Sequence, residues 1–223
     1  LYTRKNDVFV PLHQRSEMAN KEGADLFLSI HVNAVDPGRT APSGALTLVM
    51  GADKADANLD IAMRENDVIT YEDDYRTTYE GYTPGSPESF IIFSLMQYVN
   101  IEQSMALANM IQGRYKMDTP IPDRGARQQN LLVLWKIAMP GVLTELGFLP
   151  NDNDRRTLTT ASGQRKLATA LFNAICEYKY SVESKSSFAV DAATQGSTPV
   201  TAGTASGTAQ TSAPRRQQAE HAA

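Results

Sequence analysis

The sequence predicts an α/β domain with a mostly parallel sheet flanked by helices, because strand and helix patterns alternate along its first 180 residues. Residues 25–33 alternate between apolar and polar side chains, which is typical of a strand. Residues 45–50 form a second, mostly apolar strand pattern, and residues 167–178 carry apolar side chains at the spacing of one helix face. These patterns fit a layered core of the size that a chain of 223 residues can build.

The first helix and strand place one histidine at an end of the sheet. Pro11 suits a first helical turn and Gly23 the position after a helix, so we expect a helix over 11–22. It leads into the strand at 25–33, whose side chains point alternately to two faces. The two predicted faces are Leu26, Leu28, Ile30 and Val32 on one side and Phe27, Ser29, His31 and Asn33 on the other. His31 therefore lies near the carboxyl end of the strand.

Further elements follow along the chain, with one interruption. The apolar patterns predict helices at 55–69, 104–115 and 167–178 and short strands at 131–134 and 142–145. The segment from Tyr71 to Pro87 is polar, aromatic and rich in turn residues, and Ser86-Pro87-Glu88 then supplies the start signals of a new helix. We interpret 71–100 as an insertion in the domain.

The two ends of the sequence differ from its body. After Tyr180 the composition shifts to Ser, Thr, Ala, Gly and Gln, so we expect 181–223 to be a disordered low-complexity tail or linker after a domain at 1–180. Residue 1 is Leu, and we expect the natural N-terminus, with one or more strands of the sheet, to precede it. The single cysteine, Cys176, excludes an intrachain disulfide and is expected to be buried.

Charge and hydropathy exclude two classes of partner. The formal net charge is −4, and the basic residues are scattered and do not form a stripe that would neutralise phosphates, so we expect no nucleic-acid partner. No apolar run approaches the roughly 20 residues that span a bilayer, so we expect no transmembrane segment.

Two residues stand out as candidates for chemistry. Of the three histidines, only His31 lies at a strand end, where ligands gather in open parallel sheets; His13 falls in a helix and His221 in the tail. Glu145 ends the apolar run 141–145, where an uncompensated carboxylate would cost several kcal/mol. From the residues alone, His31 is a hydrogen-bonded structural residue or a metal ligand.

The role of Glu145 is open in the same way. It forms a buried salt bridge, with Arg124 or Arg4 as the candidate partner, or it is a catalytic group. Periodicity does not distinguish the two interpretations.

Several longer segments resemble one enzyme family, in the family's order along the chain. The segments are Thr3-Arg4 with Asp7, Leu12 and Arg15, Ala19-Asn20, residues 24–34, Glu65-Asn66, Ser104 with Ala108, Arg124-Gly125, Val133-Leu134 and residues 139–151. Over residues 1–180 the chain resembles the zinc-dependent N-acetylmuramoyl-L-alanine amidases of the amidase-3 family. The resemblance implies that His31 is a zinc ligand and that Glu145 is the catalytic acid/base.

The resemblance also implies an incomplete metal site. The family's other two protein ligands, a histidine in a Gly-His-Gly-type turn and a glutamate, precede the Thr3-Arg4 motif and are not in this sequence. A hydrolytic zinc ion usually has three protein ligands, and His13 lies in the wrong place to replace one. We therefore expect this chain alone to be inactive, as part of an enzyme that cleaves the amide bond between N-acetylmuramic acid and L-alanine in peptidoglycan.

Some members of the family carry an insertion whose helix blocks the zinc until an activator protein displaces it. Residues 71–100 lie in the comparable region, and Glu88 or Glu102 is a candidate ligand for the open metal position. In the simpler interpretation, Glu88 only favours the start of its helix.

The substrate implies a periplasmic or extracellular location and a role in cell-wall turnover and cell division. Two other classes remain open: a catalytically inactive cell-wall binding module that retains the fold, and an unrelated metallohydrolase of the same architecture.

Overall fold

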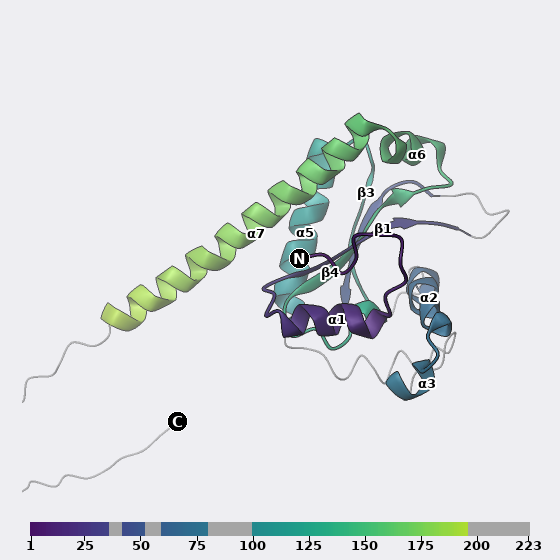
Figure 1. The fold of residues 1–223 in the computed structure, drawn as a ribbon. Coiled ribbons are helices and arrows are strands. Elements are labelled where there is room, and N and C mark those ends of the chain that lie inside the picture. Colours follow the sequence, from purple (N-terminus) through teal and green to yellow (C-terminus); the bar gives the residue numbers. More distant parts are fainter. Residues whose placement is uncertain (36–41, 52–58, 80–99, 196–223) are drawn as a thin grey trace, which may run out of the picture. The chain divides into compact units, whose positions relative to one another are not determined.

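The computed structural model describes residues 1–35, 42–51, 59–79 and 100–195, with side chains up to Lys185. Leu1–Glu183 form one compact unit, and a second unit begins at Ser184. The first unit contains all the strands of the described residues (Figure 1).

Four strands form the sheet in the order β1-β4-β2-β3. The strands are β1 (Phe27–Asn33), β2 (Ala45–Met50), β3 (Asp123–Gln129) and β4 (Gly141–Phe148). The pairs β1–β4 and β2–β3 are parallel, whereas β2 and β4 are antiparallel. The predicted mostly parallel α/β sheet is therefore confirmed, with one antiparallel pair at its centre.

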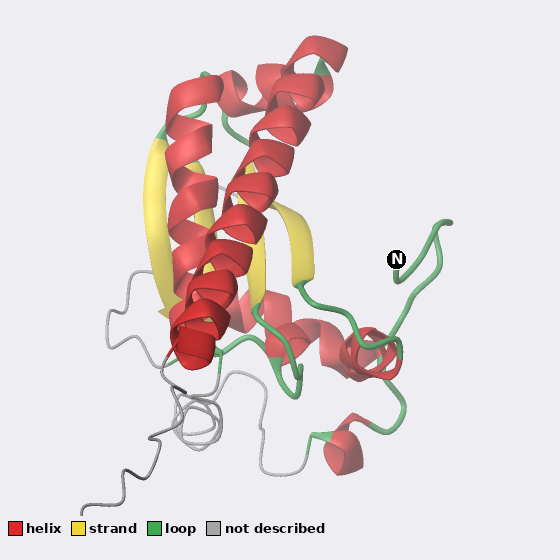
Figure 2. Ribbon diagram, turned by 90° about the vertical axis from the view of Figure 1, so that its left-hand side faces the viewer, coloured by secondary structure: helices red, strands yellow, loops and turns green. Residues whose placement is uncertain are grey.

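Helices cover both faces of this sheet. They are α1 (Leu12–Lys21), α2 (Leu59–Asp67), α3 (Tyr75–Thr78), α5 (Ile101–Asp118), α6 (Asp152–Thr159) and α7 (Ala161–Gln195), with short 3-10 helices η2 (Val68–Tyr71) and η3 (Leu132–Leu134). One apolar cluster joins α1, α2 and η3 to Leu46, Leu48 and Leu143 of the sheet. A second joins α5 and α7 to Ala45, Val49 and Val142 on the other face, along which Figure 2 shows both helices running.

The third strand is not where the sequence predicted it. Within this range Leu132–Leu134 form the buried 3-10 helix η3, and β3 lies at Asp123–Gln129, a polar segment. β3 pairs only with β2 among the described strands, so most of its side chains stay partly exposed and need not be apolar. The apolar run at 131–134 instead fills the core between α1 and α2.

The predicted apolar face of β1 is only partly covered. Ile30 and Val32, on the edge strand of the described sheet, are 54% and 44% exposed. The opposite face holds buried Phe27 and Asn33, so the His31 side of β1 faces α1 and α2.

The last helix is longer than the sequence predicted. It continues past Tyr180 to Gln195, because neither proline nor glycine occurs between Gly163 and Gly196 to end it. Residues 181–195 are therefore helical, contrary to the expected start of the tail. Cys176, on this helix, is exposed and not buried.

The insertion predicted at 71–100 is described only in part. η2 ends at Tyr71, α3 follows at Tyr75–Thr78, and the helix start predicted at Ser86-Pro87-Glu88 lies outside the described residues. Among the helices that the structure describes, none combines the length and apolarity that crossing a bilayer requires.

Candidate functional site

The register between β1 and β4 brings the two predicted site residues together. His31 pairs with Glu145 across the parallel strands, and both side chains project toward the sheet face that carries α1 and α2. From α2, Glu65 reaches the same place, with its Oε2 at 2.7 Å from His31 Nδ1. One ligand atom from each of His31, Glu65 and Glu145 lies within 4.8 Å of the other two, so the three side chains could hold one metal ion.

Glu145 is fully buried without a polar partner. Its exposed fraction is 0%, and neither carboxylate oxygen accepts a hydrogen bond from the described residues. Burial, and after it the nearby charge of Glu65, raise the pKa of Glu145 to about 7, against the opposing effect of His31 and Arg64. A carboxyl group in this state exchanges protons near neutral pH.

Neither of the two arginines considered for Glu145 forms a salt bridge with it. Arg124 donates a hydrogen bond to the Ser43 carbonyl and lies over the Phe148 ring. Arg4 donates to the Val8 carbonyl. Both arginines therefore make other contacts, and the buried carboxylate keeps its charge uncompensated by either.

The imidazole of His31 is held at both ring nitrogens. Nδ1 contacts Glu65, and Nε2 lies 2.8 Å from Ser29 Oγ, two residues earlier on the same face of β1. Burial lowers the pKa of His31, but the hydrogen bond and charge of Glu65 and the charge of Glu145 outweigh it, so the pKa is raised overall. A partly buried imidazole between two carboxylates is a local environment that favours a cation.

This donor set fits zinc. Imidazole nitrogen and carboxylate oxygens are among the ligands that zinc binds in proteins. The orphaned carboxylate of Glu145 points to the same conclusion, because a buried charge without a partner costs several kcal/mol unless a cation compensates it.

Glu65 was not assigned a role from the sequence, although the Glu65-Asn66 pair was one of the resembling segments. The structure shows what Asn66 does. Its side-chain amide donates to the Asn130 carbonyl at 2.7 Å and accepts from the Leu132 N–H at 2.8 Å. These two buried bonds fix α2 against Asn130 and the first residue of η3, and so hold Glu65 over β1.

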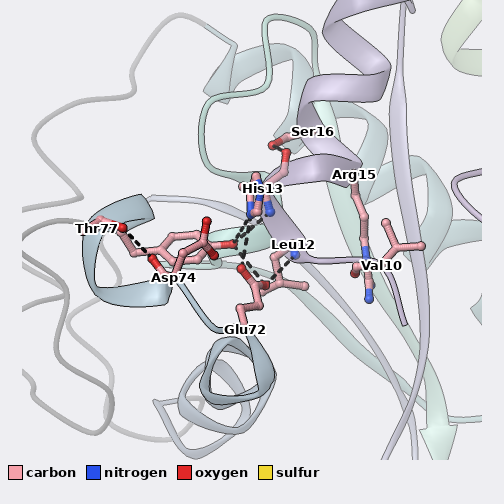
Figure 3. Close-up of polar contacts among 9 residues, drawn as sticks. Val10, Leu12, His13, Arg15, Ser16, Glu72, Asp74 and Thr77 are labelled. Carbon is pink, nitrogen blue, oxygen red and sulfur yellow. Dashed lines mark hydrogen bonds and ion pairs between the residues drawn. The ribbon is translucent and has the colours of Figure 1, made fainter. Parts of the chain in front are cut away.

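The other candidate ligands lie elsewhere. His13 Nδ1 is 3.2 Å from Glu72 Oε2 (Figure 3), and both residues also contact the Tyr79 hydroxyl in a separate polar cluster. Glu102 is exposed on the first turn of α5 and is not part of the group around His31. Glu88 lies outside the described residues.

Comparisons with known proteins identify related amidases. Residues 1–177 match the Amidase_3 family model, described as N-acetylmuramoyl-L-alanine amidase. The chain is 32% identical over 177 residues to the N-acetylmuramoyl-L-alanine amidase AmiA of Salmonella typhimurium, covering 79% of this chain and 59% of that protein. AmiA of Escherichia coli is 31% identical over 177 residues, which again cover 79% of this chain and 59% of that protein. The chain thus spans about three fifths of the length of these curated relatives.

Solved structures show the same fold. An N-acetylmuramoyl-L-alanine amidase from Clostridium difficile superposes with a TM-score of 0.54 at 23% identity, covering 80% of this chain and 70% of that one. The catalytic domain of CwlV, an N-acetylmuramoyl-L-alanine amidase from Bacillus (Paenibacillus) polymyxa, gives a TM-score of 0.52 at 25% identity, covering 79% and 69%. By the family match over residues 1–177, this chain belongs to the N-acetylmuramoyl-L-alanine amidase family.

Proposed function

We propose that the protein is a zinc-dependent peptidoglycan hydrolase that cleaves the amide bond between N-acetylmuramic acid and the L-alanine of the stem peptide. The observation that carries this proposal is the buried, unpartnered carboxylate of Glu145 beside His31. Family membership supports the substrate class, and the donor set around His31 supports zinc.

In this proposal His31 is a metal ligand and Glu145 is the general acid/base. Zinc supplies the Lewis acidity that polarises the amide carbonyl and lowers the pKa of a bound water. Glu145 accepts a proton from the attacking water and gives it to the leaving nitrogen of L-alanine, so the amine departs neutral. The raised pKa of Glu145 suits both transfers, because a group that titrates near 7 can accept and return a proton at neutral pH.

Glu65 orients the imidazole in this proposal. Its carboxylate contacts His31 Nδ1 and so fixes the ring plane and the tautomer, as a carboxylate partner does for many metal-binding histidines. We expect the 223-residue chain alone to be inactive, because the two further ligands that the resemblance implies are not among its residues. In this proposal the enzyme acts in the periplasm or at the cell surface, where its substrate lies.

The test is zinc content and muropeptide hydrolysis, measured on the complete gene product and on the 223-residue chain. His31→Ala is expected to lose bound zinc and activity together. Glu145→Gln is expected to keep zinc and to lose activity by about 100-fold or more. The control is Glu17→Gln, on an exposed position of α1. Zinc retained by His31→Ala, or full activity in Glu145→Gln, would contradict the assignment.

The alternative, an inactive cell-wall binding module, makes a different prediction. Such a module would bind insoluble peptidoglycan without releasing muropeptides, with or without added zinc. The third interpretation, an unrelated metallohydrolase, is wrong, because residues 1–177 match the N-acetylmuramoyl-L-alanine amidase family. The activator proposed for 71–100 remains a prediction, since only 71–79 and Asn100 of this segment are described. Equal muropeptide release with and without residues 72–98 would refute occlusion by the insertion.

A further inference from the structure

Two arginines converge on the cavity beside His31. A cavity of about 350 Å³ has Arg4, Arg15, His31 and Glu65 in its wall. A neighbouring cavity of about 340 Å³ also has Arg4, Arg15 and His31 in its wall. His31 and both arginines therefore line shared open space.

Both guanidinium groups retain N–H donors for a further hydrogen bond. Arg15 uses its Nε to donate to the Val10 carbonyl at 2.9 Å, a contact drawn in Figure 3. Arg4 uses Nη1 to donate to the Val8 carbonyl, also at 2.9 Å. Among the described residues neither arginine forms a salt bridge with a carboxylate. Anchoring through Nε leaves the terminal nitrogens of Arg15 for another acceptor, in the planar geometry that suits a carboxylate.

The electrostatics of Arg15 also favour an added anion. Burial lowers its pKa, and the positive charge of Arg4 lowers it further, while Glu72 and Glu65 act in the opposite direction. Two like charges beside a half-buried cavity repel each other, and an anion placed between them relieves that repulsion.

The position of Arg15 is fixed by the start of its helix. Pro11 provides no side-chain cap for α1, and the Leu12 N–H donates instead to Glu72 Oε1 at 2.8 Å. Figure 3 shows Glu72 under this helix end and Arg15 one turn further along. The guanidinium group is thus carried by a helix that is anchored at its N-terminus.

We propose that Arg15, with Arg4, binds a carboxylate of the stem peptide on the leaving-amine side of the scissile amide. This inference rests on the proposed function. A stem peptide whose second residue is a γ-linked acidic amino acid carries a free α-carboxylate only about five covalent bonds from the scissile nitrogen. Phe9 and Tyr71, in edge-to-face contact with ring centroids 6.4 Å apart, contribute apolar wall to the same cavity. The cavity thereby combines an apolar wall with a cationic anchor next to His31, the candidate metal ligand.

The test uses two muramyl tripeptides that differ only at the second stem residue, which bears a free α-carboxylate or the corresponding carboxamide. The zinc-loaded complete gene product is expected to prefer the carboxylate substrate by about 10-fold or more in kcat/KM, as a charge-assisted hydrogen bond would give. Arg15→Gln is expected to reduce this ratio to near one, through a higher KM for the carboxylate substrate and with zinc content unchanged. Arg15→Lys is expected to retain part of the preference, since it keeps the charge without the planar fork.

The matched control is Arg127→Gln, because Arg127 also donates to a backbone carbonyl but lies on β3 at the opposite end of the strand order. It is expected to leave the substrate ratio unchanged. No preference in the wild-type protein, or equal losses on both substrates in Arg15→Gln, would overturn the proposal.

A failure of the proposed function gives a different result. If the wild-type protein cleaves neither tripeptide, binding of the two corresponding alanyl dipeptides is followed by NMR chemical-shift titration. Tighter binding of the carboxylate form that depends on Arg15 would support the subsite even without hydrolysis. Equal binding of both forms would reject it.

Discussion

Glu65 Oε2 lies 2.7 Å from His31 Nδ1, so a helix glutamate fixes the imidazole that faces Glu145. Glu65→Gln keeps the shape of this side chain and removes its charge. We expect zinc affinity to fall by about 10- to 100-fold, as for other carboxylate partners of metal-binding histidines. Competition with a chromophoric chelator measures this change, and Glu17→Gln on exposed α1 should leave the affinity as it is. Unchanged affinity in Glu65→Gln would remove Glu65 from the site.

The metal-free protein should lose stability as the pH rises. The pKa of Glu145 is about 7 in the folded protein, against an ordinary value of 4.5. As the pH rises, the unfolded chain therefore releases this proton at a lower pH than the folded protein does. The free energy of unfolding is then expected to decrease by about 3 kcal/mol between pH 4.5 and 7, at 1.36 kcal/mol per pKa unit. The raised pKa of His31 acts in the same direction, because its stabilisation is present below 6.5 and is lost as the pH rises through the folded value.

Urea unfolding of zinc-free protein at several pH values measures this dependence. Glu145→Gln should flatten the slope, since the amide does not titrate. Excess zinc should reduce the loss of stability with rising pH, because metal binding favours deprotonated ligands. A stability that rises between pH 4.5 and 7 in the metal-free protein would contradict the burial that raises the Glu145 pKa.

The sequence predicted the position of His31 and Glu145 because the apolar patterns around both are strong. Alternation in β1 puts His31 near the carboxyl end of its strand, the apolar run of β4 puts Glu145 within a buried strand, and the parallel register makes the two residues neighbours. The proximity of His31 and Glu145 therefore follows from two local sequence patterns and from the parallel pairing of their strands. Their chemical roles came only from the resemblance and remain proposals.

Other features depend on tertiary packing that no local pattern reveals. Glu65 lies on the polar side of an ordinary amphipathic helix, and only the fold shows that this side faces β1. The two sets of hydrogen bonds made by Asn66 span more than sixty residues of sequence separation. The sequence did not predict β3, because its polar residues lack the apolar pattern of a buried strand and suit an edge strand. The apolar residues 131–134 were predicted as a strand, but such a run suits a buried turn equally well.

Asn66→Ala should destabilise the fold and thereby test how α2 is fixed. Asn66 is 1% exposed, and its removal leaves the Asn130 carbonyl and the Leu132 N–H without this partner. We expect the free energy of unfolding to fall by about 3 kcal/mol for these two buried groups. Asn20 makes an equivalent pair of bonds, to the Lys136 carbonyl and the Ala138 N–H, but at an exposed position. Asn20→Ala should therefore cost less, and an equal or larger loss there would refute burial as the cause.

Glu72→Ala should destabilise the start of α1 without disturbing the candidate metal group of His31, Glu65 and Glu145. Glu72 accepts hydrogen bonds from the Leu12 N–H at 2.8 Å and the Tyr79 hydroxyl at 3.3 Å, and it lies against His13 (Figure 3). Its removal leaves these buried donors unpaired, so we expect a loss of about 2–3 kcal/mol in urea unfolding, against about 1 kcal/mol for Tyr79→Phe. Zinc affinity should stay within twofold of the wild type, because neither residue belongs to the group around His31. A large loss of affinity in Glu72→Ala at full stability would instead place this cluster in the metal site.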